Sequence, residues 1–484
     1  MASKALLRKK LSDIIKISRK NGGGKDMVLS ELKNREFYKK TLMILVPVML
    51  QQLITVGINF LDHIMVGGFG EAQIAGVSFG NQFYSLFQFV CMGLGSGAIV
   101  MSSQLWGAKK YDDLKPVAAI ALRLTLLLCF AFTVFAVIFP ETVLRIYTNQ
   151  EAVIKAGREY MRLIGCTFIF AGLSSTSTYL LRSTNQVKIP LISSIIAFFL
   201  NLFFNWVFIF GKLGAPRLEA VGAAVGTVIA RAFEFLFIFG YFVFKEKNFK
   251  FRLPDFIRLK CGDVLRTYMR YSLPVLVSDT MLGVGLSVVS VIIGHMSDSM
   301  VAARAIIQSA SQLITVVNMG MGGASSVVIG NSIGDGQIKR AMREGIAYCV
   351  LAVGIGLLGV LILVLLGDAY LSLYKITPET LKTAKSLMLV MKILMPLQTL
   401  SYVTSKGILR GGGDTKFLLF GDIILLWTIS IPLGALAAMV WNMTPFWVFL
   451  FLQAEYALKG LLCGGRFLSK KWIKVIANDE KKTA

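Results

Sequence analysis

The sequence predicts an all-α polytopic membrane protein, with twelve transmembrane helices in two six-helix repeat lobes and both termini in the cytoplasm. Hydrophobic residues make up 55% of the 484 residues and charged residues only 16%, which leaves too little polar surface for a soluble chain of this length. Apolar runs of about 20 residues, enough to cross a bilayer as a helix, recur along the chain. The two halves of the chain also resemble each other.

The apolar runs define the expected helices. A closed barrel is the other architecture that satisfies backbone groups in lipid, but it needs short alternating strands, which this sequence does not show. The twelve expected spans are 42–66, 77–100, 117–139, 156–179, 187–211, 221–244, 271–293, 304–328, 343–367, 384–408, 418–440 and 446–465.

The basic residues are spread unevenly over the connections. The net charge of +24 would on its own also suit a nucleic-acid partner. Twelve Lys and Arg precede the first span and eight lie in 245–270, whereas 67–76 has none. Because basic residues gather in cytoplasmic connections, this pattern favours a lipid bilayer as the partner, not nucleic acid, and both termini inside. No signal peptide is expected before the spans.

These charges and spans divide the chain into five segments. The longest basic connection separates the first six spans from the last six, so each lobe has its own set of helices. The expected segments are a basic cytoplasmic N-terminal segment 1–41, an N-lobe 42–244, a basic linker 245–270, a C-lobe 271–465 and a basic tail 466–484.

The two lobes align as internal repeats. A shift of 227 residues places Pro47 on Pro274 and MGLGSGA (92–98) on MGMGGAS (319–325), and a shift of 228 places LRSTNQVK (181–188) on LRGGGDTK (409–416). Parallel repeats of this kind are common in transporters, where the substrate site lies at the repeat interface. Channels and membrane enzymes can also be duplicated, so these classes stay open.

Four further stretches resemble one known family. They are NFLDHIMVGGFGEAQIAG (59–76), NLFFNWVFIFG (201–211), AVGAAVGTVIAR (220–231) and LRGGGDTKF (409–417). Together they resemble the MATE (multidrug and toxic compound extrusion) family, bacterial type, over about residues 36–475. The resemblance implies a V-shaped cavity between two lobes, alternating access and cation-driven export of amphipathic, often cationic compounds.

Asp279 is the acid that lies deepest in an expected span. It is eight residues, or about 12 Å of helical rise, from the inner end of its span, and no Lys or Arg lies within four residues of it. Charges in lipid are costly, so we expect Asp279 against protein or in a water-filled cavity. There it could carry a proton or, with neighbouring oxygens, coordinate Na⁺.

Asp62 ends a polar stripe on the first span. Gln52, Thr55, Asn59 and Asp62 are spaced 3, 4 and 3 residues apart, which puts them on one helical face. Such a face is expected to meet neighbouring helices or water, although a carboxylate that merely reaches the outer surface is the alternative. The family resemblance implies an acidic cation site at Asp62.

Other spans carry similar polar faces, which we expect to line a shared cavity. The alternative is that these side chains only join helices by hydrogen bonds. The residues are Asn81, Ser85 and Gln88 in the second span, Asn201 and Asn205 in the fifth, and Gln308, Gln312 and Thr315 in the eighth, which the shift of 227 aligns with the second.

Three further acids have simpler explanations. Arg231 precedes Glu234 by three residues and Lys459 follows Glu455 by four, so we expect a local ion pair for each. Asp422 lies one turn into its span, where the helix dipole lowers the free-energy cost of a negative charge.

The family pattern also has departures. Asn205 stands where members often have Asp or Asn, and the tenth span contains no acid. The sequence therefore does not decide whether the ion site lies in the N-lobe, in the C-lobe or in both. It also does not decide whether the coupling ion is H⁺ or Na⁺.

The sequence thus predicts a secondary antiporter of the cytoplasmic membrane rather than an enzyme. It would export small amphipathic or cationic drug-like compounds in exchange for H⁺ or Na⁺, without a cofactor and as a monomer. The glycines of RGGGDT (410–415) lack the spacing of a phosphate-binding loop, and a turn with Asp414 or Thr415 as a helix cap is expected there. A flippase for lipid-linked saccharides, and a channel or membrane enzyme, are the rival functions.

Overall fold

The helices are long and account for most of the chain. The structure, a computed structural model, describes residues 34–66, 71–259 and 261–476, except for the side chains of residues 59, 62–64, 66, 71, 72 and 263. The elements are α3 (Arg35–Val66), α4 (Glu71–Gly107), α5 (Tyr111–Ile138), α6 (Pro140–Arg145), α7 (Glu151–Ser183), α8 (Lys188–Phe210), α9 (Glu219–Phe244), α10 (Asp255–Arg258), α11 (Gly262–Gly294), α12 (Asp298–Gly334), α13 (Ile338–Ser372), α14 (Pro378–Tyr402), η1 (Val403–Leu409), α15 (Thr415–Ile423), η2 (Ile424–Ser430), α16 (Ile431–Met439), α17 (Pro445–Leu452) and α18 (Ala454–Leu468).

Twelve helical segments of the described chain are long and apolar enough to cross a membrane, which confirms the number predicted. The ends of most of them differ from the apolar runs by several residues, because many of the helices continue past the apolar stretch. The tenth, for example, runs from Pro378 to Leu409, although its apolar core begins only near residue 384.

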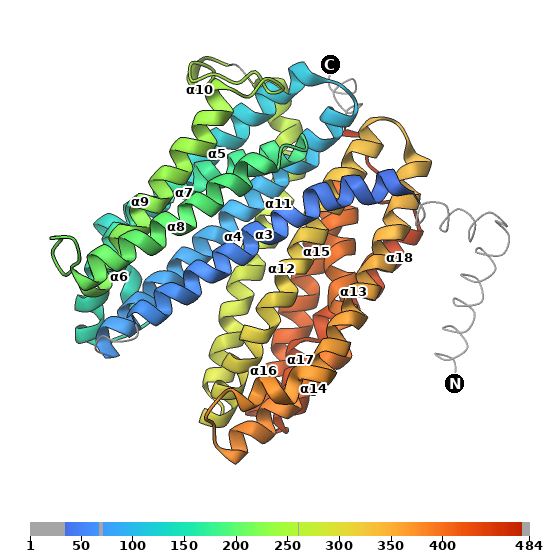
Figure 1. The fold of residues 1–484 in the computed structure, drawn as a ribbon. Coiled ribbons are helices and arrows are strands. Elements are labelled where there is room, and N and C mark those ends of the chain that lie inside the picture. Colours follow the sequence, from blue (N-terminus) through green and yellow to red (C-terminus); the bar gives the residue numbers. More distant parts are fainter. Residues whose placement is uncertain (1–33, 67–70, 260, 477–484) are drawn as a thin grey trace, which may run out of the picture.

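The helices form two bundles (Figure 1). The first, here the N bundle, contains α3–α9. The second, the C bundle, contains α12–α18, and α11 lies between them, packed against α4 on one side and α15 on the other. The bundles approach each other at the end that holds α10, here called the linker end, and are further apart at the opposite end, the far end, where α6 lies (Figure 1).

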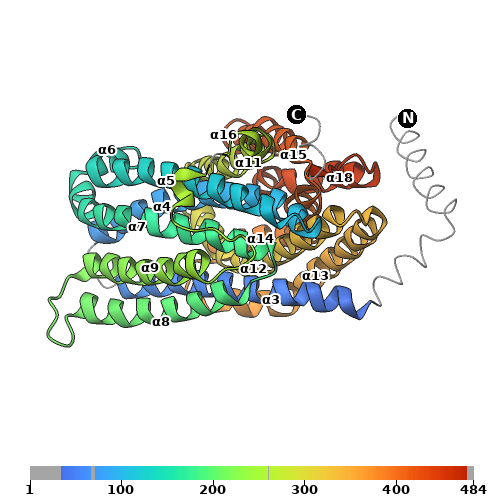
Figure 2. The same cartoon turned by 90° about the horizontal axis from the view of Figure 1, so that it is seen from above.

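The first helix of each repeat crosses to the other bundle. The early part of α3 reaches α13, where the hydroxyls of Thr41 and Tyr348 are 2.7 Å apart, while its later part runs beside α8 (Figure 2). In the same way α11 packs against α4 and α5 as well as the C bundle. Both helices contain an internal proline, Pro47 and Pro274, at positions related by the repeat.

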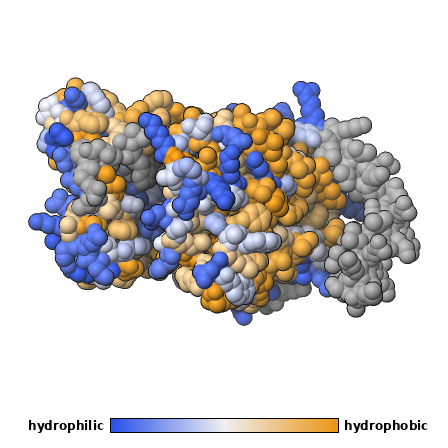
Figure 3. All heavy atoms as spheres, turned by 90° about the horizontal axis from the view of Figure 1, so that it is seen from below, coloured by the Kyte–Doolittle hydropathy of each residue, from blue (hydrophilic) through white to orange (hydrophobic). Residues whose placement is uncertain are grey.

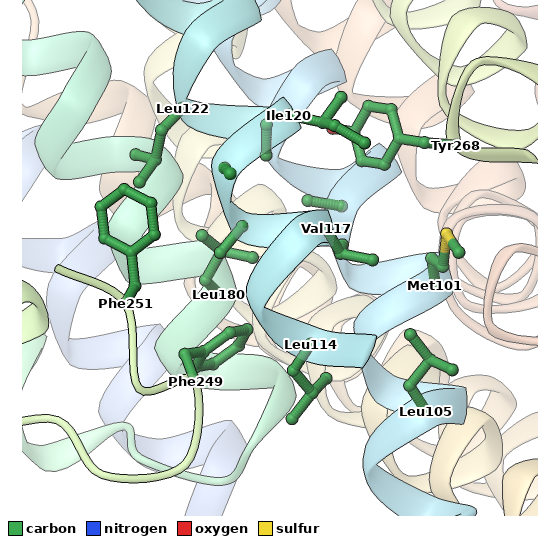
Figure 4. Packing of buried hydrophobic residues seen from close by; sticks show 14 of the residues in the cluster. Met101, Leu105, Leu114, Val117, Ile120, Leu122, Leu180, Phe249, Phe251 and Tyr268 are labelled. Atoms are coloured by element: carbon green, nitrogen blue, oxygen red, sulfur yellow. The ribbon is translucent and has the colours of Figure 1, made fainter. Parts of the chain in front are cut away.

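A hydrophobic core ties the linker to the N bundle. Phe249 and Phe251, which follow α9, are fully buried and point toward side chains of α5 and α7, among them Leu114, Leu122 and Leu180 (Figure 4). At about 1.5–3 kcal/mol per buried side chain of this size, these contacts hold the linker against the bundle.

The outer flanks keep apolar side chains exposed. On α13, Leu357, Leu361 and Leu365 are 56%, 50% and 68% exposed, and their spacing of four residues puts them on one face. Hydrophobic residues cover wide areas of the molecular surface, while hydrophilic side chains gather in separate groups (Figure 3). Surfaces of this kind suit acyl chains rather than water.

The bundles approach each other closely where α4 crosses α12. Gly107 lies against the carbonyl oxygen of Asn331, and Gly334 against that of Gln104, so closely that neither glycine has room for a β-carbon. The repeat shift of 227 residues aligns Gly107 with Gly334 and Gln104 with Asn331, so the two contacts are equivalent. Two small residues thus allow the two backbones to meet near the linker end.

The glycine-rich segment after η1 forms the expected turn. Gly413 adopts a left-handed conformation with φ +83°, and the repeat-equivalent Asn185 has φ +62°; Gly and Asn are the residues that accept this conformation most readily. The expected side-chain cap is wrong, because the carboxylate of Asp414 makes no capping hydrogen bond and accepts instead from Arg466 at 2.6 Å.

Candidate functional site

A small cavity lies between the two bundles. Its volume is about 50 Å³, which is room for a few water molecules or one small polar group. Three cationic side chains and two tyrosines face it alongside small and apolar residues. The lining residues are Val48, Gln52, Met92, Ser96, Ile99, Tyr179, Arg182, Met319, Gly322, Gly323, Ser326, Tyr402, Lys406 and Arg410.

Asp279 lies behind this cavity, fully buried in α11. Its oxygens accept from Lys406 Nζ at 2.6 Å and from the two terminal nitrogens of Arg410 at 2.8 and 3.0 Å. Ser96 of α4 donates a further hydrogen bond at 3.2 Å. A buried carboxylate is stable when it is paired and hydrogen-bonded in this way, and the bidentate arginine fixes its orientation.

Lys406 joins Asp279 to a second acid. Its ammonium is 3.0 Å from Asp422 of α15, and Asp422 also accepts a hydrogen bond from Ser278 and pairs with Lys459 of α18. One continuous network therefore joins the buried side chains Asp279, Lys406, Arg410 and Asp422, of which none is more than 9% exposed, and Lys459 extends it to α18.

The predicted ion pair between Glu455 and Lys459 is wrong. Lys459 pairs with Asp422 of α15, and the buried Glu455 forms no salt bridge with it, because α18 turns this lysine toward α15. In the N bundle the corresponding local expectation is confirmed, since Arg231 is 2.6 Å from Glu234.

The local backbone explains why Lys406 and Arg410 reach the same acid. They lie four residues apart, across the π-helical segment η1, a form that often marks functional sites. Gly407 and Gly411 lie so close to Ser325 and Ser326 of α12 that neither has space for a side chain. The backbone of η1 is thereby held against α12, with both cationic side chains directed at Asp279.

Arg182 reaches the cavity from the N bundle. Only 7% of this residue is exposed, and its guanidinium lies over the Tyr179 ring, 5.1 Å from the centroid. One nitrogen donates to Gln51 at 3.5 Å, and another would lie 3.4 Å from a β-carbon on Gly323 of α12. Arg182 therefore spans the contact between the bundles.

The predicted polar residues are not all in one place. Gln52 lines the cavity. Asn81 accepts from Tyr160 at 2.9 Å and Gln88 donates to Tyr84 at 2.5 Å, so both hold the N bundle together. Five others are exposed: Thr55, Ser85, Gln308, Gln312 and Thr315.

Asn201 and Asn205 do come together, as their spacing predicts. The two side chains are buried and hydrogen-bonded at 3.2 Å, and Asn201 donates to Thr227 of α9 at 3.3 Å. They therefore join α8 to α9 rather than lining the described cavity. The backbones of Asn59 and Asp62 belong to α3, but their side chains lie outside the described residues.

Sequence reasoning missed most of the basic residues at the cavity. Arg182 and Arg410 stand at equivalent positions of the matched stretches LRSTNQVK and LRGGGDTK, which is a signal that both would face the interface between repeats. Lys406 offered a weaker signal, as a cation one helical turn before Arg410 within an apolar span.

Twelve candidate spans in two repeated bundles, with a polar cavity at their interface, are an architecture typical of multi-pass membrane transporters. The chain matches the family model described as MatE over residues 47–207 and 274–455, and it belongs to that family. It is accordingly a membrane transporter and not an enzyme.

Relatives and solved structures resemble nearly the whole chain. A probable multidrug resistance protein NorM from Neisseria meningitidis serogroup B is 25% identical, over 88% of this chain and 94% of its own. The probable multidrug resistance protein YoeA from Bacillus subtilis is 26% identical, over 92% and 97%. The structure titled as the outward-facing conformation of a multidrug resistance MATE family transporter has a TM-score of 0.81 at 18% identity, over 91% and 98%.

Proposed function

We propose that this transporter exports small amphipathic compounds in exchange for an inward flow of cations, as a multidrug antiporter. Its family membership and its relatives, whose names describe probable multidrug resistance proteins, support the export. The observation that carries the exchange is the position of Asp279, a fully buried carboxylate bound from both bundles, by Ser96 on one side and by Arg410 on the other.

The position of Asp279 supplies a physical basis for coupling. A cation that binds this carboxylate must compete with Lys406 and Arg410, which are held against α12, and with Ser96 of the N bundle. Ion binding therefore changes the contacts between the bundles. Antiport requires that each ligand has a different affinity for the two conformations of the transporter, and a carboxylate at the bundle interface meets that requirement.

A proton suits Asp279 better than Na⁺ does. Three cationic nitrogens already lie within 3.0 Å of its two oxygens. These positive charges oppose a proton and a sodium ion alike. A proton, however, adds to a single oxygen, whereas Na⁺ needs a shell of oxygen ligands, whose places the three nitrogens occupy. Asp62 remains a proposed second site for H⁺ or Na⁺.

The shape of the molecule fits one step of alternating access. The distribution of basic residues predicts that the linker end is cytoplasmic. The contact of α4 with α12 closes that end, while the bundles are further apart at the far end (Figure 1). We assign this conformation to the outward-facing step, from which cargo leaves and a cation enters.

The decisive experiment is dye transport by protein reconstituted into proteoliposomes with one imposed gradient at a time. We expect a pH gradient to drive uphill transport and a Na⁺ gradient at constant pH to drive none. Asp279→Asn should abolish uphill transport while downhill exchange continues, and Asp62→Asn tests the second site. Glu151→Gln, which alters an exposed ion pair with Arg145, is the matched control and should transport as wild type does.

Two results would overturn this proposal. Transport driven by Na⁺ at constant pH would exclude a proton as the only coupling ion. Uphill transport by both aspartate variants at the wild-type rate would remove the two carboxylates from the coupling.

A further inference from the structure

The cavity between the bundles is lined by one cation, Arg182, that no acid of the described residues neutralises. Arg410 is neutralised by Asp279, and Lys406 is shared between Asp279 and Asp422. Within the part of the chain that the structure describes, no carboxylate pairs with Arg182, whose guanidinium donates to Gln51 and lies over the Tyr179 ring. A buried cation without a counter-charge is costly, so its presence at a cavity calls for an external partner.

Comparison of the two repeats shows how the imbalance arises. The shift of 228 carries Arg182 onto Arg410, so both halves contribute an arginine to the cavity. The shift of 227 carries Gln52 onto Asp279, so only the second half contributes the acid that neutralises its arginine. Gln52 lines the same cavity, and its amide brings no negative charge to Arg182.

The other groups at the cavity also suit an anion. Lys406 and Arg410 line it as well, so three cationic side chains from two bundles converge on a space of about 50 Å³. Arginine matches the geometry of carboxylate and phosphate oxygens, and the two tyrosines, Tyr179 and Tyr402, offer hydroxyls and aromatic faces for an adjoining apolar group.

We propose that this cavity is a binding subsite for an anionic group, a carboxylate or phosphate carried by an amphipathic molecule, and that Arg182 is its principal ligand. The proposal rests on the proposed export function, because the anionic molecule bound at the subsite would be cargo. Binding itself needs no gradient, so it can fail or succeed independently of the coupling test. The source of the anionic group is a soluble molecule or a lipid headgroup.

The test uses two probes that differ mainly in charge, 1-naphthoate and the uncharged 1-naphthamide, with purified full-length protein in uncharged detergent. We expect wild type to bind radiolabelled naphthoate and the amide to compete poorly. Arg182→Gln should weaken naphthoate binding by about tenfold or more, the size expected for a charged hydrogen-bond partner, and leave the affinity for naphthamide unchanged. Arg182→Lys should retain part of the preference.

A second variant keeps the arginine and its packing. Gln52→Glu gives Arg182 the internal carboxylate that Arg410 already has, and it should abolish the preference for naphthoate as effectively as Arg182→Gln. The matched control is Gln150→Glu, which adds the same charge on an exposed turn and should bind both probes as wild type does. Thermal unfolding of each variant separates loss of the subsite from loss of the fold.

The lipid source is tested in nanodiscs of phosphatidylcholine with or without phosphatidylglycerol. Displacement of naphthoate by the anionic lipid in wild type but not in Arg182→Gln supports the subsite with a headgroup as its occupant. Unchanged binding supports it with a soluble anion. Equal affinity of folded wild type for the two probes, or a preference that survives both Arg182→Gln and Gln52→Glu, would overturn the proposal.

Discussion

Gly107 of α4 lies directly against the main-chain carbonyl oxygen of Asn331 in α12, with no space between them for a side chain. We expect Gly107→Leu to disfavour closure of the linker end. Overpacking of this kind costs about 1–3 kcal/mol, enough to shift a conformational equilibrium by roughly 5- to 150-fold. Spin labels at Ile146 and Leu373, both exposed at the far end, should then lie closer together than in wild type.

The matched control for this prediction is Gly240→Leu in α9, where an added β-carbon would have no atom within 4 Å. It should leave the distance between the labels as in wild type. A distance distribution for Gly107→Leu identical to that of wild type would show that this crossing does not set the conformation.

Asp422 should be far more important for stability than Glu455, although both are buried acids near Lys459. Removing one partner of a buried ion pair leaves an uncompensated charge, at about 3–5 kcal/mol. Asp422→Asn takes one carboxylate partner from Lys406 and from Lys459, whereas Glu455→Gln breaks no salt bridge among the described residues. We expect Asp422→Asn to lower the temperature at which the protein loses its monodisperse peak in size-exclusion chromatography, and Glu455→Gln to change it little.

A double variant makes the reason for this difference testable. Adding Lys459→Met to Asp422→Asn removes the stranded ammonium and should restore part of the lost stability. If the double variant is as unstable as the sum of the two single ones, the pair is not energetically coupled.

Arg123 is predicted to anchor the linker between the bundles. It donates to the carbonyl oxygens of Asp255, Phe256 and Leu259 at 3.0, 2.7 and 2.8 Å, and only the planar fork of an arginine serves all three. Arg123→Lys should therefore increase amide hydrogen exchange over residues 252–259 almost as much as Arg123→Gln does. Full protection in the lysine variant would show that charge alone suffices.

The sequence predicts the helices well and the charged network poorly, for a physical reason. Membrane spans are set by runs of apolar residues, which are local. The burial of Asp279 was predictable from its depth in a span, but its partners Lys406 and Arg410 are 127 and 131 residues away. Nothing local indicates which distant helix supplies a counter-charge.

The same reasoning explains the two local ion-pair predictions. Arg231 pairs with Glu234, as their spacing of three residues predicts. Lys459 meets Asp422 on another helix, and this contact between helices overrides the local one with Glu455. The repeat was the better guide, because it aligns Arg182 with Arg410 at the cavity.

The attachment of the linker should depend on pH through Asp255. Burial alone would raise the pKa of this carboxyl, but the ammonium of Lys115, 2.9 Å away, and the backbone N–H of Arg252 lower its pKa below the ordinary value of 3.8. A carboxyl whose pKa is lowered on folding stabilises the folded state above its unfolded pKa and loses that contribution as the pH falls through its folded pKa. Amide protection over residues 252–259, corrected for intrinsic exchange, should thus stay constant from pH 7 to about pH 4 and fall below that, whereas in Lys115→Met it should already be reduced at neutral pH. Protection that is equal in the two proteins at every pH would contradict a role for this ion pair in holding the linker.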